Sequence, residues 1–161
     1  MKNSAQAWNE KHVLQCELAA EVLRSSGSVC MRVTGWSMLP VLWPGDTLVI
    51  EHVKSDAICE GDIVLFSRGH RFVAHRVVMK DSSFGGAKLQ TKGDAVSRPD
   101  SPVAHDDLLG RVSSIVRNGK SIAPSRHLCF SERAVASMFQ RSEIAARVVV
   151  GVHKLSQTSQ A

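Results

Sequence analysis

The sequence contains no tyrosine, and only 5% of its 161 residues are aromatic. Lysines and arginines are scattered rather than gathered in runs, and they do not alternate with aromatic residues, although the formal net charge is +5. Proteins that bind nucleic acid commonly combine a basic patch with aromatic side chains that stack on bases. We therefore expect no nucleic-acid partner. The charge indicates a mildly cationic surface, with attraction to an anionic membrane surface as the alternative.

Cysteine is also scarce, and its spacing excludes two common uses. Cys16, Cys30, Cys59 and Cys129 lie far apart, and no two of them form a C-x-x-C pair. The spacing of zinc ligands is therefore absent, and a chain of this length needs no disulfides to stabilise its core. We predict thiols in a reducing compartment, and neither a metal nor another cofactor.

Long hydrophobic runs are missing as well. No stretch approaches the roughly 18 consecutive apolar residues of a membrane span. Residues Met1 to Glu10 lack the charged-then-apolar pattern and the cleavage site of a signal peptide. The sequence therefore predicts a cytoplasmic protein, or one that touches the membrane only peripherally.

The residues that are present predict one folded, mainly β domain. A hydrophobic fraction of 43% and a charged fraction of 22% exclude general disorder. Short apolar runs separated by glycines predict a β core over residues 29–122, between an amphipathic helix in 1–28 and a C-terminal helix and tail in 123–161. The helical patterns run from about Ala5 to Arg24 and, with Ser131 as N-cap, to about Val150. The strand candidates are Leu48 to Ile50, Ile63 to Phe66, Phe72 to Met79, Lys88 to Thr91 and Leu108 to Val116.

One stretch, Thr34 to Asp46, has the features of a turn that presents a nucleophile. Ser37 stands two residues after Gly35 and precedes Met38-Leu39-Pro40, and the stretch closes on Trp43-Pro44-Gly45-Asp46, which fits a type II turn. A serine used for acyl transfer must stand at a backbone bend with free amides nearby. We therefore predict a strand, a serine-bearing turn, a tight turn and a second strand. The alternative is an ordinary turn serine.

A base and an acid for this serine are available further along the chain. A neutral imidazole can take a hydroxyl proton near pH 7, because the ordinary histidine pKa is about 6.5. His75, in the middle of an apolar strand candidate, is the candidate base, and Asp94 or Asp100 could orient it. Taken singly, His75 can equally be a structural strand residue and Asp94 a turn residue.

Five short boxes in this order resemble the type I signal peptidases and, within the same wider group, the self-cleaving SOS-type repressors. They cover roughly residues 29 to 122. The boxes are Ser37-Met38-x-Pro40 with Gly45-Asp46, Gly61-Asp62-Ile63-Val64, His75-Arg76-Val77-Val78, Thr91-Lys92-Gly93-Asp94 with Asp100, and Leu109-Gly110-Arg111-Val112.

The resemblance implies a serine endopeptidase whose β fold binds peptide as a strand in an extended groove. His75 followed by Arg76 is similar to the archaeal and endoplasmic-reticulum enzymes, which have histidine where the common bacterial enzymes have a lysine base. The implied catalytic residues are Ser37, His75 and Asp94 or Asp100. The implied substrate contacts are Gly35, Trp36, Met38 and Pro40, and the implied partner is a peptide or preprotein.

The sequence departs from that family pattern at three places. A charged amphipathic helix stands where signal peptidases have a transmembrane anchor. Gly35 replaces a hydroxyl residue that often assists the oxyanion, and Ala95-Val96 replace asparagines. Loss of one oxyanion donor corresponds to about 3 kcal/mol of transition-state stabilisation.

Two other functions are weighed against the peptidase. A self-cleaving regulator needs a DNA-binding unit, and the roughly 30 residues before the core provide one helix rather than a helix-turn-helix. A non-catalytic peptide-binding module would keep the groove without using Ser37.

Overall fold

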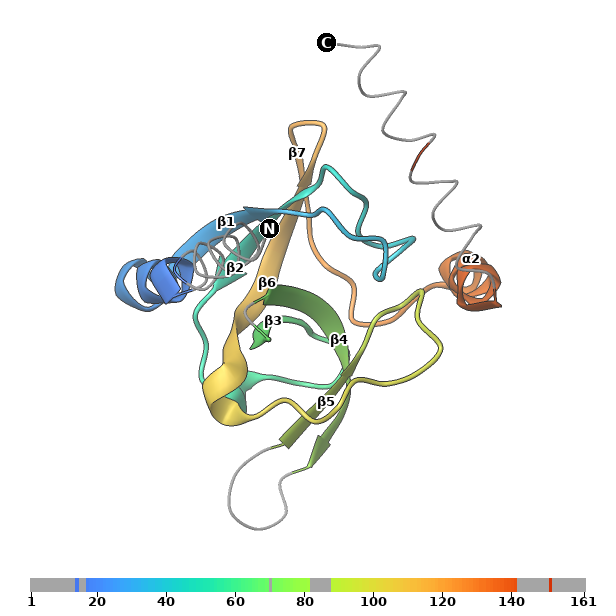
Figure 1. Cartoon of the computed structure of the whole chain (residues 1–161). Coiled ribbons are helices and arrows are strands. Elements are labelled where there is room, and N and C mark those ends of the chain that lie inside the picture. Colours follow the sequence, from blue (N-terminus) through green and yellow to red (C-terminus); the bar gives the residue numbers. More distant parts are fainter. Residues whose placement is uncertain (1–13, 15–16, 70, 82–87, 142–150, 152–161) are drawn as a thin grey trace, which may run out of the picture.

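The computed structural model describes residue 14 and residues 17–69, 71–81, 88–141 and 151. Seven strands form one antiparallel sheet in the order β1-β2-β6-β3-β4-β5, with β7 paired to β6 (Figure 1). The predicted mainly β class is confirmed. The strands are β1 (Ser28–Arg32), β2 (Thr47–Glu51), β3 (Ile63–Arg68), β4 (Arg71–Asp81), β5 (Lys88–Lys92), β6 (Leu108–Arg117) and β7 (Lys120–Ile122).

Each predicted strand has a counterpart in the sheet. The four residues Ile63 to Phe66, which begin β3, are all buried. Their sequence predicts this, because apolar and polar residues do not alternate in it. β7 was not predicted, because its three residues are all exposed and carry no apolar pattern. Register shifts interrupt the pairing of β2 with β6, β3 with β6 and β4 with β5. Such irregularities increase the local twist and bend the sheet.

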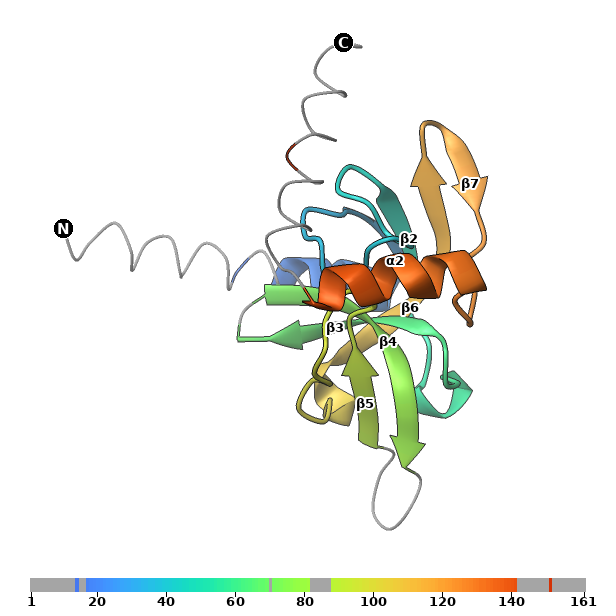
Figure 2. The same ribbon diagram turned by 90° about the vertical axis from the view of Figure 1, so that its right-hand side faces the viewer.

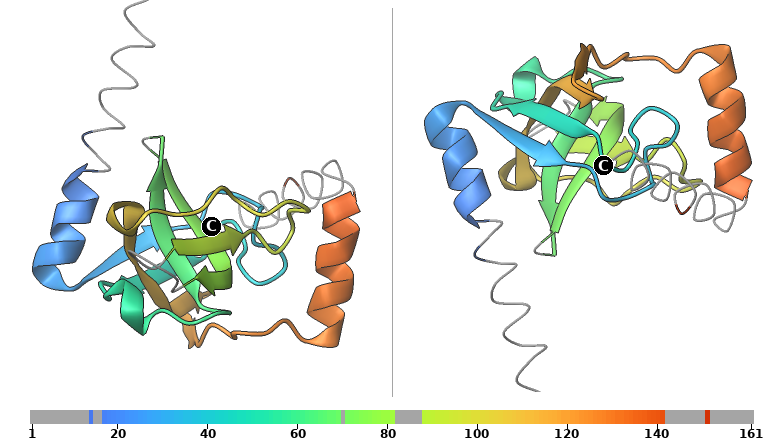
Figure 3. Two further views of the ribbon diagram at one scale, coloured as in Figure 1. Left: turned by 90° about the horizontal axis from the view of Figure 1, so that it is seen from below. Right: turned by 90° about the horizontal axis from the view of Figure 1, so that it is seen from above.

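Two helices lie on opposite sides of the sheet (Figures 1 and 3). The N-terminal helix is described at residues 14 and 17–26, and α2 spans Phe130–Arg141. The remaining parts of both predicted helices fall outside the described residues. Cys129, rather than Ser131, is the N-cap of α2: its carbonyl accepts from the Arg133 amide at 2.9 Å, and its amide donates to Glu132 at 2.8 Å. No helix in the described ranges is long and apolar enough to span a membrane.

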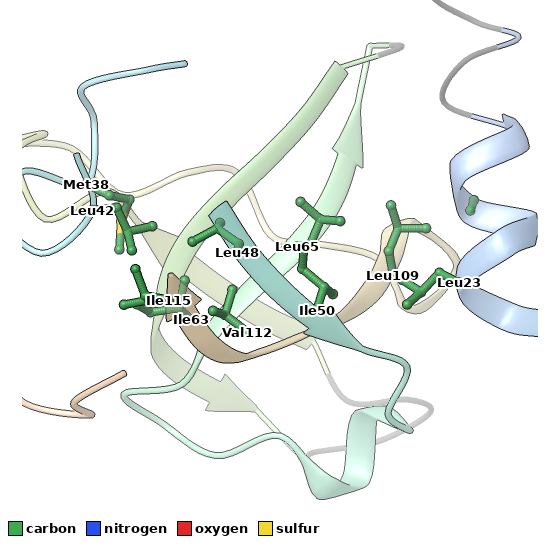
Figure 4. Packing of buried hydrophobic residues seen from close by; sticks show 11 residues of the cluster. Leu23, Met38, Leu42, Leu48, Ile50, Ile63, Leu65, Leu109, Val112 and Ile115 are labelled. Carbon is green, nitrogen blue, oxygen red and sulfur yellow. The ribbon is translucent and has the colours of Figure 1, made fainter. Parts of the chain in front are cut away.

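The main core cluster runs as a row along the sheet. Figure 4 shows Met38 and Leu42 at one end, Leu48 and Leu65 between, and Leu23 of the N-terminal helix at the other end. These side chains are less than 5% exposed. The serine-bearing turn and the N-terminal helix are therefore both fixed to the sheet by burial of apolar surface.

A smaller cluster fixes α2 behind the serine-bearing turn. Phe139 of α2 packs with Leu39 and Ala95, and Trp36 and Trp43 border the cluster. Figure 2, which looks from the α2 side, shows this helix lying across that side of the sheet. Leu39 is two residues from Ser37, so α2 supports the turn that carries the serine.

Candidate active site

Ser37 lies in the connection between β1 and β2, which folds as the sequence predicts. Gly45 has a φ of 103°, and the Asp46 amide donates to the Trp43 carbonyl at 3.0 Å. A glycine at positive φ in the third position defines a type II turn. The bend at Ser37 is held by amides of Leu39 and Val41 that donate to the carbonyls of Trp36 and Met38.

The structure brings three of the predicted side chains into one hydrogen-bonded chain. Ser37 Oγ lies 2.9 Å from His75 Nε2, and His75 Nδ1 lies 2.6 Å from Asp100 Oδ2. An ionised carboxylate only accepts hydrogen bonds, so the imidazole proton belongs on Nδ1 and Nε2 is free to accept from the serine hydroxyl. This is the arrangement in which a histidine can act as a general base toward a serine.

Asp100 is itself held by groups from two other strands. Its Oδ2 also accepts from the Thr91 hydroxyl at 2.8 Å, and its amide donates to the Thr91 carbonyl at 2.8 Å. Its Oδ1 faces Arg68 Nη1 at 3.4 Å. Thr91 is fully buried in β5, and Arg68 ends β3. The carboxylate therefore has little freedom to leave the imidazole.

Asp94, the other candidate acid, makes a different contact. Its carboxylate forms a two-bonded pair with Arg76, at 2.9 Å to Nε and 2.8 Å to Nη2, and both side chains are more than nine-tenths buried. Arg76 also donates to the carbonyls of Gly61 and Ser125, and Gln140 of α2 donates to the Asp94 carbonyl. Asp94 thus joins β4, α2 and the turn after β5, whereas Asp100 contacts His75.

The glycine before Asp94 is required by close packing against the serine and histidine. A Cβ at Gly93 would lie 2.6 Å from the Ser37 carbonyl oxygen and 3.0 Å from His75 Nε2. The Ala95 amide donates to the same Ser37 carbonyl at 2.8 Å. The segment from Gly93 to Ala95 therefore packs closely against both the serine and the base.

A groove of about 460 Å³ opens in front of Ser37 and His75. One wall is the chain from Met31 to Gly35, and the other is the start of β4 from Phe72 to His75. β1 pairs only with β2, and β4 pairs with β5 only from Arg76 onward, so each wall has a strand edge unpaired by the described residues. The floor consists of apolar core residues, namely Met38, Leu42, Leu48 and Leu65.

The four predicted substrate contacts are divided by the bend of the chain. Gly35 and Met38 line the groove, although the Met38 side chain is only 3% exposed and lies in its floor. Trp36 packs toward α2 instead, and the Pro40 carbonyl accepts from the Trp43 indole at 2.7 Å. The described residues that line the groove do not include these two. The turn places Gly35, Ser37 and Met38 along the groove and Trp36 against the α2 cluster, which the box pattern alone does not reveal.

Two other acidic residues of the boxes hold the fold together. Asp46 forms a two-bonded pair with Arg117 of β6, and this hydrogen bonding raises the pKa of Arg117. Asp62 accepts from Arg126 at 2.8 Å, which raises the pKa of Arg126 in the same way. Neither carboxylate contacts His75. Asp46 holds β6, and Asp62 holds the segment that leads to α2, so these two Gly-Asp pairs do not position the base.

Sequence reasoning assigned no role to Thr91 or Arg68. Thr91 begins the Thr91-Lys92-Gly93-Asp94 box, and its hydroxyl group could have indicated a hydrogen bond to one of the candidate acids. Arg68 has no signal in the sequence, because its contact with Asp100 joins positions 32 residues apart. Among the described residues, no three His, Cys, Asp or Glu side chains gather closely enough to hold a metal ion.

A mainly β fold with a Ser–His–Asp hydrogen-bonded chain beside a groove is an architecture of the serine peptidase class. A family model described as Peptidase S24-like matches residues 4–96, more than half of the chain, and the chain therefore belongs to the Peptidase S24-like family. The match includes Ser37 and His75 and ends before Asp100. No curated protein sequence matches the chain. The coarse peptidase relationship inferred from the five boxes is confirmed.

Proposed function

We propose that this protein is a serine endopeptidase of the signal peptidase type, in the histidine-containing subtype. The observation that carries the proposal is the 2.9 Å contact between Ser37 Oγ and His75 Nε2, with Asp100 on the other ring nitrogen at 2.6 Å. The substrate is a peptide or preprotein segment that reaches the groove in extended form.

The reaction follows from where the protons lie. Ser37 Oγ attacks the carbonyl carbon of the scissile peptide bond while its proton passes to His75 Nε2. The tetrahedral intermediate collapses when that proton moves to the leaving amine, which gives an ester on Ser37 and a free new N-terminus. Water then gives a proton to Nε2 and its hydroxide to the ester carbon. The second tetrahedral intermediate collapses as Nε2 returns that proton to Ser37 Oγ, which releases the acyl product as a carboxylic acid and restores the serine hydroxyl. Asp100 stabilises the imidazolium in both steps.

The groove walls favour a substrate bound as a β-strand. In the described structure, β1 pairs with β2 on one edge and residues 72–75 of β4 pair with β3 on one edge, so a peptide between their other edges can form main-chain hydrogen bonds on both sides. The floor is apolar. Backbone pairing supplies affinity with little dependence on sequence, and the floor selects apolar side chains at alternate positions.

The developing oxyanion has one evident donor. The Ser37 amide donates no backbone hydrogen bond to another described residue, and its peptide unit is oriented by the Ala95 amide on the Ser37 carbonyl. Gly35 has no hydroxyl that could donate to the oxyanion. A second donor therefore has to be another group, such as a backbone amide that reaches the oxyanion once substrate is bound.

The pH dependence of cleavage tests the assignment of the base. Because neutral His75 must accept the serine proton, we expect kcat/KM to fall with a slope of one on the acidic side, where the imidazole becomes protonated. Initial rates on a fluorogenic peptide between pH 5 and pH 10 measure this limb. A limb above pH 8 would identify a lysine base such as Lys92 and would contradict the role of His75.

A further inference from the structure

Arg68 makes a set of contacts behind Asp100 that the reaction as described does not use. Its Nη1 faces Asp100 Oδ1 at 3.4 Å, and its Nη2 donates to the Ser101 carbonyl at 2.6 Å. Its guanidinium carbon lies 5.1 Å from the centre of the Phe66 ring. Phe66 in turn meets the His75 ring edge-on, with 6.2 Å between centroids. Arg68 therefore touches both the acid and the aromatic ring that packs on the base.

We propose that Arg68 is a positioning residue that holds Asp100 by its outer oxygen and sets the pH range over which His75 works. The proposal rests on the proposed peptidase function. Each oxygen of Asp100 has its own partners: Oδ2 takes His75 and Thr91, and Oδ1 faces Arg68. Without Arg68 the described side-chain contacts would hold the carboxylate through Oδ2 alone, so the group could pivot about that oxygen.

The charge of Arg68 acts on the imidazole through Asp100. A carboxylate favours the protonated imidazole, and a cation on the far side of that carboxylate weakens the effect. The Arg68 side chain is 39% exposed, so solvent and salt screen its charge. Its influence is therefore a shift in pH dependence rather than a loss of the reaction.

Two other described arginines lie near His75, and no contact joins either of them to Asp100. The guanidinium of the neighbouring Arg76 is paired with Asp94 and buried. Arg32 lines the groove and does not contact Asp100 in the described structure. In the described part of the chain, Asp100 is thus the charged group that contacts the ring, and Arg68 lies behind it.

The test compares Arg68→Gln, which removes the charge, with Arg68→Lys, which keeps it. We expect the acidic limb of kcat/KM to move to higher pH by roughly 0.2 to 0.7 unit in Arg68→Gln at low ionic strength, and much less in Arg68→Lys. In 0.5 M NaCl the native limb should approach that of Arg68→Gln. A purely structural arginine would change stability and leave the limb in place.

A second readout does not depend on cleavage. The His75 ring protons can be followed by NMR during a pH titration of the resting protein, with the signal assigned through a His75→Gln variant. The titration midpoint should rise in Arg68→Gln by the same amount as the kinetic limb. Identical midpoints in native and Arg68→Gln protein would overturn the proposal for Arg68. Absence of cleavage by the native protein would count against the peptidase function, and the titration would still decide the role of Arg68.

Discussion

Replacing Ser37 with alanine is expected to lower kcat/KM by about 10⁴-fold or more, because the acyl intermediate can no longer form. The substitution removes one oxygen from a turn that is held by backbone hydrogen bonds and by Leu39 and Phe139. The fold and the groove should therefore survive. Cleavage of a quenched fluorescent peptide, monitored with equal concentrations of folded native and variant protein, measures the loss.

Ser131→Ala is the matched control for this experiment. Ser131 is exposed on α2, so the variant should retain native activity. Peptide binding by the Ser37→Ala protein separates the peptidase from a non-catalytic module. Binding with intact affinity but without cleavage fits the peptidase. If the Ser37→Ala protein cleaves as fast as the native protein, Ser37 is not the nucleophile.

Replacing Asp94 with alanine is expected to reduce the free energy of unfolding by about 3–5 kcal/mol, because Arg76 would be left buried without its counter-charge. Asp94 and Arg76 are only 6% and 7% exposed, so water cannot easily replace the lost pair. Urea denaturation followed by tryptophan fluorescence measures the change. The sequence left Asp94 and Asp100 as alternatives for the acid, and this experiment assigns them separate tasks.

Asp100→Asn is the matched comparison. It keeps the size of the side chain beside His75, but the amide cannot serve as the same charged acceptor for Nδ1. We expect this variant to lose activity by a large factor, on the order of 10³-fold or more, with a smaller loss of stability. An Asp94→Ala protein of native stability that has lost its activity would show that Asp94, not Asp100, acts on the base.

The sheet could be predicted from sequence because its central strands carry their own signal. The runs at Ile63 to Phe66 and Leu108 to Val116 are rich in apolar and β-branched residues, and Gly61, Gly69 and Gly119 lie near their ends. β7 carries no such pattern, since all three of its residues are exposed. The type II turn at Pro44-Gly45 was predictable because its geometry is local.

The sequence predicted those site residues that have a suitable side chain and also lie in one of the five boxes. Ser37 and His75 stand in segments whose residue types suit acyl transfer. The choice between Asp94 and Asp100 depends on how residues 93–100 fold back over β5, which no local pattern encodes. Gly35 and Met38 line the groove whereas Trp36 and Pro40 do not, and this difference depends on how α2 packs behind the turn. Tertiary contacts decide these points.

The most direct test of the central claim is to locate the residue that a serine-directed fluorophosphonate modifies. Mass spectrometry of the labelled and digested protein should find the adduct on Ser37, and His75→Gln should slow the labelling strongly, since an unactivated hydroxyl is a weak nucleophile. Labelling of Ser37 that proceeds equally fast without the imidazole, or an adduct confined to another residue, would contradict the proposed nucleophile and base.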